Sequence, residues 1–151
     1  MVYVSLSTET ARREILVSPV ILDLIHYTKA EMRIEYPIKV TEQLQEYLDY
    51  FLESQNQLLI IEAKKEDLDF RFTQLAAQFI ALDQWEADKP CTHILGAITT
   101  GKIWEFGLLD RKAKHLDQGF DSYRVPDDIE ALMRILGVHL SFVRLILRID
   151  H

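Results

Sequence analysis

The chain has 151 residues, of which 48% are hydrophobic, and its formal net charge is −7. This length is that of one ordinary domain with a sizeable core, and the low glycine and proline content excludes long disordered stretches. The single cysteine, Cys91, excludes an internal disulfide, and we find neither a secretion leader nor eighteen consecutive apolar residues to span a membrane. We therefore expect one cytoplasmic domain over residues 1–151 with no membrane contact.

The N-terminal region is predicted to be helical in two pieces. Residues 8–17 have the pattern of a short helix. Ser18 followed by Pro19 then predicts an N-cap and a first-turn proline for a second helical piece that ends near Tyr27.

Three strands are predicted next. Apolar and polar residues alternate over 32–40 and again over 44–52, which is typical of half-buried strands. In the second of these strands, the residues expected to share one face are Leu44, Leu48, Tyr50 and Leu52. The continuous apolar run over 58–61 predicts a third strand that is buried on both faces and that leads into charged residues.

The second half of the chain is predicted to combine helices and strands. Apolar residues at helical spacing predict a helix over 70–85. Residues 91–99 and 103–109 read as two strands joined by a turn, and 120–125 as a further short strand. A final helix after Pro126 carries a long apolar stripe, which consists of Ile129, Leu132, Met133, Leu136, Leu140, Val143 and Leu147.

The order of these elements predicts an α/β fold with a mixed β-sheet flanked by helices, in the order α-β-β-β-α-β-β-α. The helix between the third and fourth strands is long enough to connect two parallel strands, and such a crossover is expected to be right-handed.

Three polar residues of the strand region point to chemistry. Side chains alternate along a strand, so Glu62 and Lys64 are expected on the same face, and a hairpin would place Asp49 beside Glu62, about 5 Å away. Two carboxylates this close repel unless a cation lies between them, and Mg²⁺ prefers such oxygen ligands. A lysine beside that ion can orient or activate a metal-bound water for attack on phosphorus.

The segments 48–50 and 59–64, together with Gln74 on the next helix, resemble the PD-(D/E)XK nuclease superfamily. The chain is most similar to the endonuclease domain at the N-terminus of type I restriction enzyme motor subunits and to its stand-alone relatives. Residues 99–106 also resemble the Thr-x-Gly-x-x-Trp stretch of those domains, and the similarity extends from about residue 8 to about residue 109.

This resemblance implies a restriction-endonuclease-like fold and an endonuclease that hydrolyses DNA with Mg²⁺, or with Mn²⁺, and leaves a 5′-phosphate. It implies that Asp49 and Glu62 are metal ligands, that Lys64 is the catalytic lysine and that Gln74 supports the site. The relatives often add a glutamate from the first helix.

Two glutamates, Glu9 and Glu14, are candidates for that role, and helical phase does not choose between them. The chain also departs from the pattern of its relatives, because Gln78 stands where they commonly have tyrosine, four residues after the glutamine.

DNA is the expected partner, but a chain of charge −7 has little basic surface with which to bind it. A homodimer, a protein partner or a local basic patch is therefore expected to supply DNA affinity. The net charge also favours an alternative, a nuclease-like binding or assembly module with weak or absent activity. In a third interpretation the chain shares only the layout of the fold, and the acidic residues are a surface feature.

Overall fold

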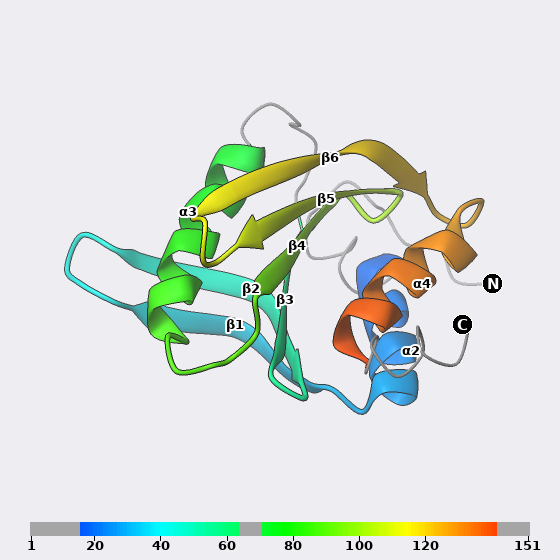
Figure 1. Cartoon of the computed structure of the whole chain (residues 1–151). Coiled ribbons are helices and arrows are strands. Elements are labelled where there is room, and N and C mark those ends of the chain that lie inside the picture. Colours follow the sequence, from blue (N-terminus) through cyan, green and yellow to red (C-terminus); the bar gives the residue numbers. More distant parts are fainter. Residues whose placement is uncertain (1–15, 64–70, 142–151) are drawn as a thin grey trace.

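The computed structural model describes residues 16–63 and 71–141 (Figure 1). In these residues six strands form one open sheet in the order β1-β2-β3-β4-β5-β6. The helices and strands are α2 (Ser18–Thr28), β1 (Glu31–Lys39), β2 (Gln45–Ser54), β3 (Gln57–Ala63), α3 (Arg71–Trp85), β4 (His93–Thr99), β5 (Ile103–Asp110), β6 (His115–Arg124) and α4 (Ile129–Leu140). Neighbouring strands are antiparallel except β3 and β4, which are parallel and connected through α3.

The predicted α/β fold with a mixed sheet is confirmed, and the order of elements agrees with one addition. The predicted order counted two strands after the crossover helix, whereas β6 is a full third strand that begins at His115, before the short strand predicted over 120–125. The first residues of β6 are mostly exposed because it is an edge strand, so they lack the apolar alternation that reveals a strand. Of the helix predicted over 8–17, residues 8–15 lie outside the described residues.

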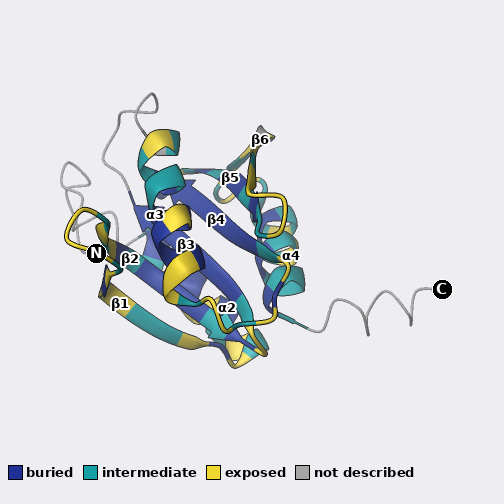
Figure 2. Ribbon diagram, turned by 60° about the vertical axis from the view of Figure 1, so that its left-hand side comes forward, coloured by how far each residue is buried: buried dark blue, intermediate teal, exposed yellow. Residues whose placement is uncertain are grey.

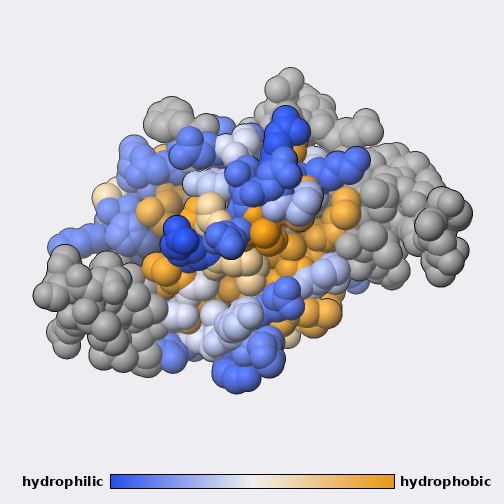
Figure 3. All heavy atoms as spheres, turned by 90° about the vertical axis from the view of Figure 1, so that its right-hand side faces the viewer, coloured by the Kyte–Doolittle hydropathy of each residue, from blue (hydrophilic) through white to orange (hydrophobic). Residues whose placement is uncertain are grey.

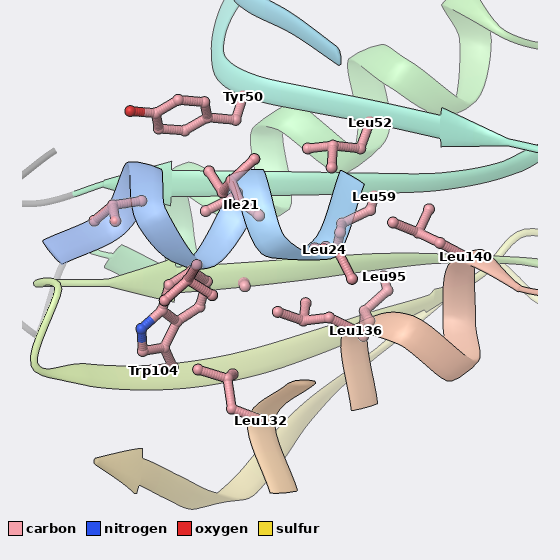
Figure 4. Close-up of a cluster of buried hydrophobic side chains, with 14 of the residues drawn as sticks. Ile21, Leu24, Tyr50, Leu52, Leu59, Leu95, Trp104, Leu132, Leu136 and Leu140 are labelled. Atoms are coloured by element: carbon pink, nitrogen blue, oxygen red, sulfur yellow. The ribbon is translucent and has the colours of Figure 1, made fainter. Parts of the chain in front are cut away.

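Helices cover both faces of the sheet. α3 lies on one face, while α2 and α4 lie together on the other (Figure 1, Figure 2). Alternate residues of β3 divide between the two resulting cores: Leu58 and Ile60 pack with α3, whereas Leu59 and Ile61 pack with α2 and α4. Figure 4 shows Leu59 in the second of these cores. All four are fully buried, as the apolar run predicts, and each burial contributes about 1.5–3 kcal/mol.

The prediction that Leu44, Leu48, Tyr50 and Leu52 share one face of the sheet is wrong. Leu44 and Leu48 pack on the α3 side of the sheet, whereas Tyr50 and Leu52 belong to the core beneath α2 and α4. The strand alternation is interrupted between Leu48 and Tyr50, where the neighbouring β1 residue Glu35 has a left-handed backbone with φ of 49°. Asp49 therefore stands at an irregular point of the sheet.

Two helix ends also differ from the prediction. The N-cap of α2 is Val17, not Ser18, whose Oγ lies 3.4 Å from the hydroxyl of Tyr50. α4 ends at Leu140 because Ser141 has an extended backbone, so the stripe predicted to continue beyond it is interrupted there. Val143 and Leu147 of that stripe lie outside the described residues. Among the helices that the structure describes, none is long and apolar enough to cross a membrane.

α2 and α4 leave a shallow hollow between them. Its volume is about 320 Å³, and it is lined by Asp23, Leu24, Tyr27, Ile129, Glu130, Met133 and Gly137. Figure 3 shows apolar side chains on this side of the molecule, bordered by hydrophilic ones. Two large apolar residues of α2 are exposed: Leu22, with 59% of its surface accessible to solvent, and Tyr27, with 77%.

His139, in the last turn of α4, connects this helix to the beginning of β3. Its Nε2 donates a hydrogen bond of 2.7 Å to the carbonyl oxygen of Leu58. Burial lowers the pKa of His139 below its ordinary value of 6.5, and it outweighs the hydrogen bond to Leu58, which acts in the opposite direction. The unfolded chain therefore binds this proton more readily than the folded chain, so the free energy of unfolding falls as pH drops below about 6.5.

Between about pH 7 and pH 5 the free energy of unfolding of the wild-type protein should fall, and that of the His139→Gln variant should fall by less. Urea unfolding at both pH values, followed by circular dichroism, measures that decrease. His26→Gln is the matched control, because His26 is exposed on α2 and forms no ion pair among the described residues, so its loss should change the pH dependence less than His139→Gln does. A His139→Gln variant with the wild-type pH dependence would contradict the assignment.

Candidate active site

The candidate site lies where the two parallel strands of the sheet end. β3 and β4 are paired up to Ala63 and Thr99, so their carboxyl ends reach the same edge of the sheet. Ligands of open α/β sheets commonly bind outside the carboxyl ends of such strands. Glu62 is the last residue but one of β3, so its carboxylate stands at this edge.

Asp49 of β2 lies next to this strand end. The antiparallel register of β2 and β3 runs to the pair Tyr50↔Ile61, and one further step brings Asp49 opposite Glu62. Oδ2 of Asp49 accepts a hydrogen bond of 2.9 Å from the backbone N–H of Ala63. A side chain of β2 thus bonds to the backbone of β3 just beyond the last paired residues, and the structure brings Asp49 beside Glu62, as the hairpin spacing predicts.

Glu62 is a buried carboxylate held by two carboxamides of α3. Only 2% of the residue is exposed. Gln74 donates from Nε2 to Oε1 of Glu62 over 3.1 Å, and Gln78 donates from Nε2 to Oε2 over 2.9 Å. The two glutamines are one helical turn apart, so both reach the same face of the sheet. Such donors offset the cost of burying a charge and fix the orientation of the carboxylate.

Gln78 is the site residue that the sequence did not assign. In the sequence, Gln78 differed from the resembled domains, which commonly have tyrosine at this position. Its spacing of four residues from Gln74 was nevertheless a signal that both side chains reach the same site. The structure buries Gln78 completely and places its Nε2 also 3.4 Å from the carbonyl oxygen of Tyr47. Its Oε1 has no hydrogen-bond partner among the described residues.

Three of the predicted site residues lie outside the described residues. These are Lys64, which follows the end of β3 directly, and the two glutamates Glu9 and Glu14. The structure therefore brings together Asp49, Glu62 and Gln74.

The donors present fit a Mg²⁺ ion. Within residues 16–63 and 71–141, no three His, Cys, Asp or Glu side chains form a cation site. Mg²⁺ does not require such a cluster, because it is usually held by one or two carboxylates and keeps several of its waters. Asp49 and Glu62 supply two neighbouring carboxylates, and the unpaired buried oxygen of Gln78 supplies an acceptor beside them. The chemistry of this set suits a hydrated, hard cation.

The Thr-x-Gly-x-x-Trp stretch over residues 99–104 has structural roles in and around the turn between β4 and β5. Oγ1 of the buried Thr99 accepts a hydrogen bond of 2.7 Å from the backbone N–H of Gly101. Gly101 has a φ of +96°, and a Cβ there would lie 2.6 Å from Cβ of Leu16, so this position requires glycine. Trp104 is fully buried in the core beneath α2 and α4 (Figure 4). The Thr-x-Gly-x-x-Trp stretch therefore shapes the strand end beside Glu62.

A hollow at the other end of β3 does not belong to this site. It has a volume of about 580 Å³ and is lined by residues of the β2–β3 turn, the start of β4 and the end of α4, among them Asn56, His93 and His139. These residues surround the beginning of β3, whereas Glu62 is near its end.

No family model, curated protein or solved structure matches this chain.

Proposed function

We propose that the chain is a cytoplasmic, Mg²⁺-dependent endonuclease of the PD-(D/E)XK type that hydrolyses DNA phosphodiester bonds. The observation that carries this proposal is the buried Glu62 carboxylate, held by two carboxamides beside Asp49 at the end of a parallel strand. In the sequence, Lys64 follows two residues later. This is the acid, acid and lysine set of that chemistry.

Each residue has a separate role in the proposed reaction. Asp49 and Glu62 would hold the metal ion, which when bound supplies a water of lowered pKa and offsets phosphate charge. Gln74 and Gln78 keep the Glu62 carboxylate in one orientation before substrate arrives. Lys64 would position the attacking water and stabilise the charge that develops on the phosphoryl oxygens.

A second candidate function is a nuclease-like binding or assembly module without strong activity. The net charge of −7 favours it, because DNA affinity comes largely from basic residues that neutralise phosphates. An active enzyme of this charge would obtain DNA affinity from a second copy of the chain or from a protein partner.

The test is cleavage by the purified chain. We expect it to nick or cut linear, branched or single-stranded DNA with Mg²⁺ or Mn²⁺ at low salt, to leave 5′-phosphate ends, and to stop when EDTA is added. Low salt is required because phosphate contacts weaken steeply as ionic strength rises. Absence of cleavage of all three substrates, together with absence of Mn²⁺ binding by calorimetry, would support the assembly module instead.

A further inference from the structure

The orientation of the Gln78 carboxamide is fixed by its neighbours. Its Nε2 faces two acceptors, Oε2 of Glu62 at 2.9 Å and the carbonyl oxygen of Tyr47 at 3.4 Å. A backbone carbonyl only accepts hydrogen bonds, so a flipped amide would set its oxygen against the carbonyl oxygen of Tyr47. Oε1 of Gln78 must therefore point to a different side of the same planar group.

That oxygen is a buried acceptor in need of a donor. Gln78 is 0% exposed, and its Oε1 has no hydrogen-bond partner in the described part of the chain. Buried polar atoms are almost always paired, because a missing partner leaves their lost hydration uncompensated. Any group that pairs with this oxygen must bring an O–H or N–H.

We propose that Gln78 belongs to the metal site and accepts, through Oε1, a hydrogen bond from a water of the bound Mg²⁺. This inference rests on the proposed function and extends it to the hydration of the ion. Mg²⁺ gives up its waters reluctantly, and each retained water is a strong donor that needs an acceptor. One side chain then does two things: Nε2 orients the carboxylate of Glu62, and Oε1 holds a water of the ion that Glu62 binds.

Gln74 is a natural comparison for this role. It is the same residue type on the same helix, it donates to the other oxygen of Glu62, and it is only partly buried. If the Gln74 side chain is removed, water can donate to Glu62 in its place, because the position is partly exposed. Bulk water cannot reach the enclosed position of the Gln78 amide in the same way. Loss of each side chain should therefore affect metal binding to a different extent.

The experiment is Mn²⁺ calorimetry on the full-length wild-type chain and on the variants Gln78→Met and Gln74→Met. Methionine has a similar volume and removes both polar atoms. We expect Gln78→Met to weaken Mn²⁺ binding roughly 10- to 100-fold, as loss of a residue that supports metal ligands typically does, and Gln74→Met to weaken it much less. Equal losses in the two variants, or unchanged affinity in Gln78→Met, would overturn the inference.

A second variant keeps the test decisive if Gln78→Met does not fold. Gln78→Glu retains an oxygen acceptor but sets a second carboxylate against Glu62, which should lower the melting temperature of the metal-free protein. Added Mn²⁺ should then raise its melting temperature by more than it raises that of the wild type, because the ion relieves the repulsion. A rise no larger than that of the wild type would count against the inference.

Failure of the proposed function is a separate result. If the wild-type chain does not bind Mn²⁺, both proposals fall. If it binds Mn²⁺ and the Gln78 variants behave like the wild type, only the role of Gln78 falls.

Discussion

Asp49→Asn and Glu62→Gln are each expected to reduce metal-dependent DNA cleavage by several orders of magnitude while the chain still folds. Each change removes one negative charge from the pair of carboxylates that would hold the ion. Asparagine keeps an oxygen that can accept the hydrogen bond from the Ala63 N–H, so the sheet loses little. Cleavage rates with Mg²⁺ and with Mn²⁺, circular dichroism and Mn²⁺ calorimetry should show loss of activity and of metal binding without loss of fold.

The Lys64→Ala variant tests whether the metal site serves catalysis or only supports the fold. It should abolish cleavage but leave Mn²⁺ affinity nearly unchanged, since an ammonium group is not a metal ligand. Lys65→Ala is the matched control, because it removes the same charge from the adjacent residue. Equal loss of activity in the two lysine variants would point to non-specific loss of DNA affinity, and activity that survives in Glu62→Gln would point to a contaminating nuclease.

The largest expected effect on stability comes from Arg111, which follows β5. Its side chain is only 10% exposed, and its Nε donates to Oδ1 of Asp83 over 2.7 Å. It also donates to the backbone carbonyl oxygens of Glu86 and Lys89, each over 2.8 Å, and so fastens the chain that follows α3. Arg111→Met leaves a buried carboxylate and several carbonyls without this donor, and we expect it to lower the free energy of unfolding by about 3–5 kcal/mol.

Lys114→Met is the matched control for Arg111→Met. Lys114 donates to the other oxygen of Asp83 over 2.6 Å, but its own side chain is 70% exposed. An exposed cation contributes little to stability, so this variant should lose less than about 1 kcal/mol. Urea unfolding of both variants measures the difference, and similar losses would show that the buried network around Arg111 does not stabilise the fold.

The elements of the fold were predictable because their signals are local. The apolar run of β3 and the helical spacing of α3 each indicate one element from a few adjacent residues. The interruption of the strand alternation beside Asp49 was not predictable, because it lies next to Glu35, a residue of another strand with a left-handed backbone. The role of Arg111 gave no signal either, since its partners are mostly backbone carbonyls 20 to 28 positions away in the chain.

The candidate site was also predictable only in part. The hairpin of β2 and β3 was predictable, and its register, extended by one step beyond Tyr50↔Ile61, puts Asp49 opposite Glu62. The buried position of Gln78 required the packing of α3 against β2 and β3, which a single sequence does not specify.

The hydrogen bond from Ala63 to Asp49 has an evolutionary consequence. Because the Asp49 carboxylate also ties two strands together, a descendant that lacked the proposed nuclease activity would still be under selection to keep an acceptor there. Glu62 would likewise persist as the acceptor for the two glutamines of α3. Among related sequences, the presence of both acids would therefore not by itself show that a protein cuts DNA.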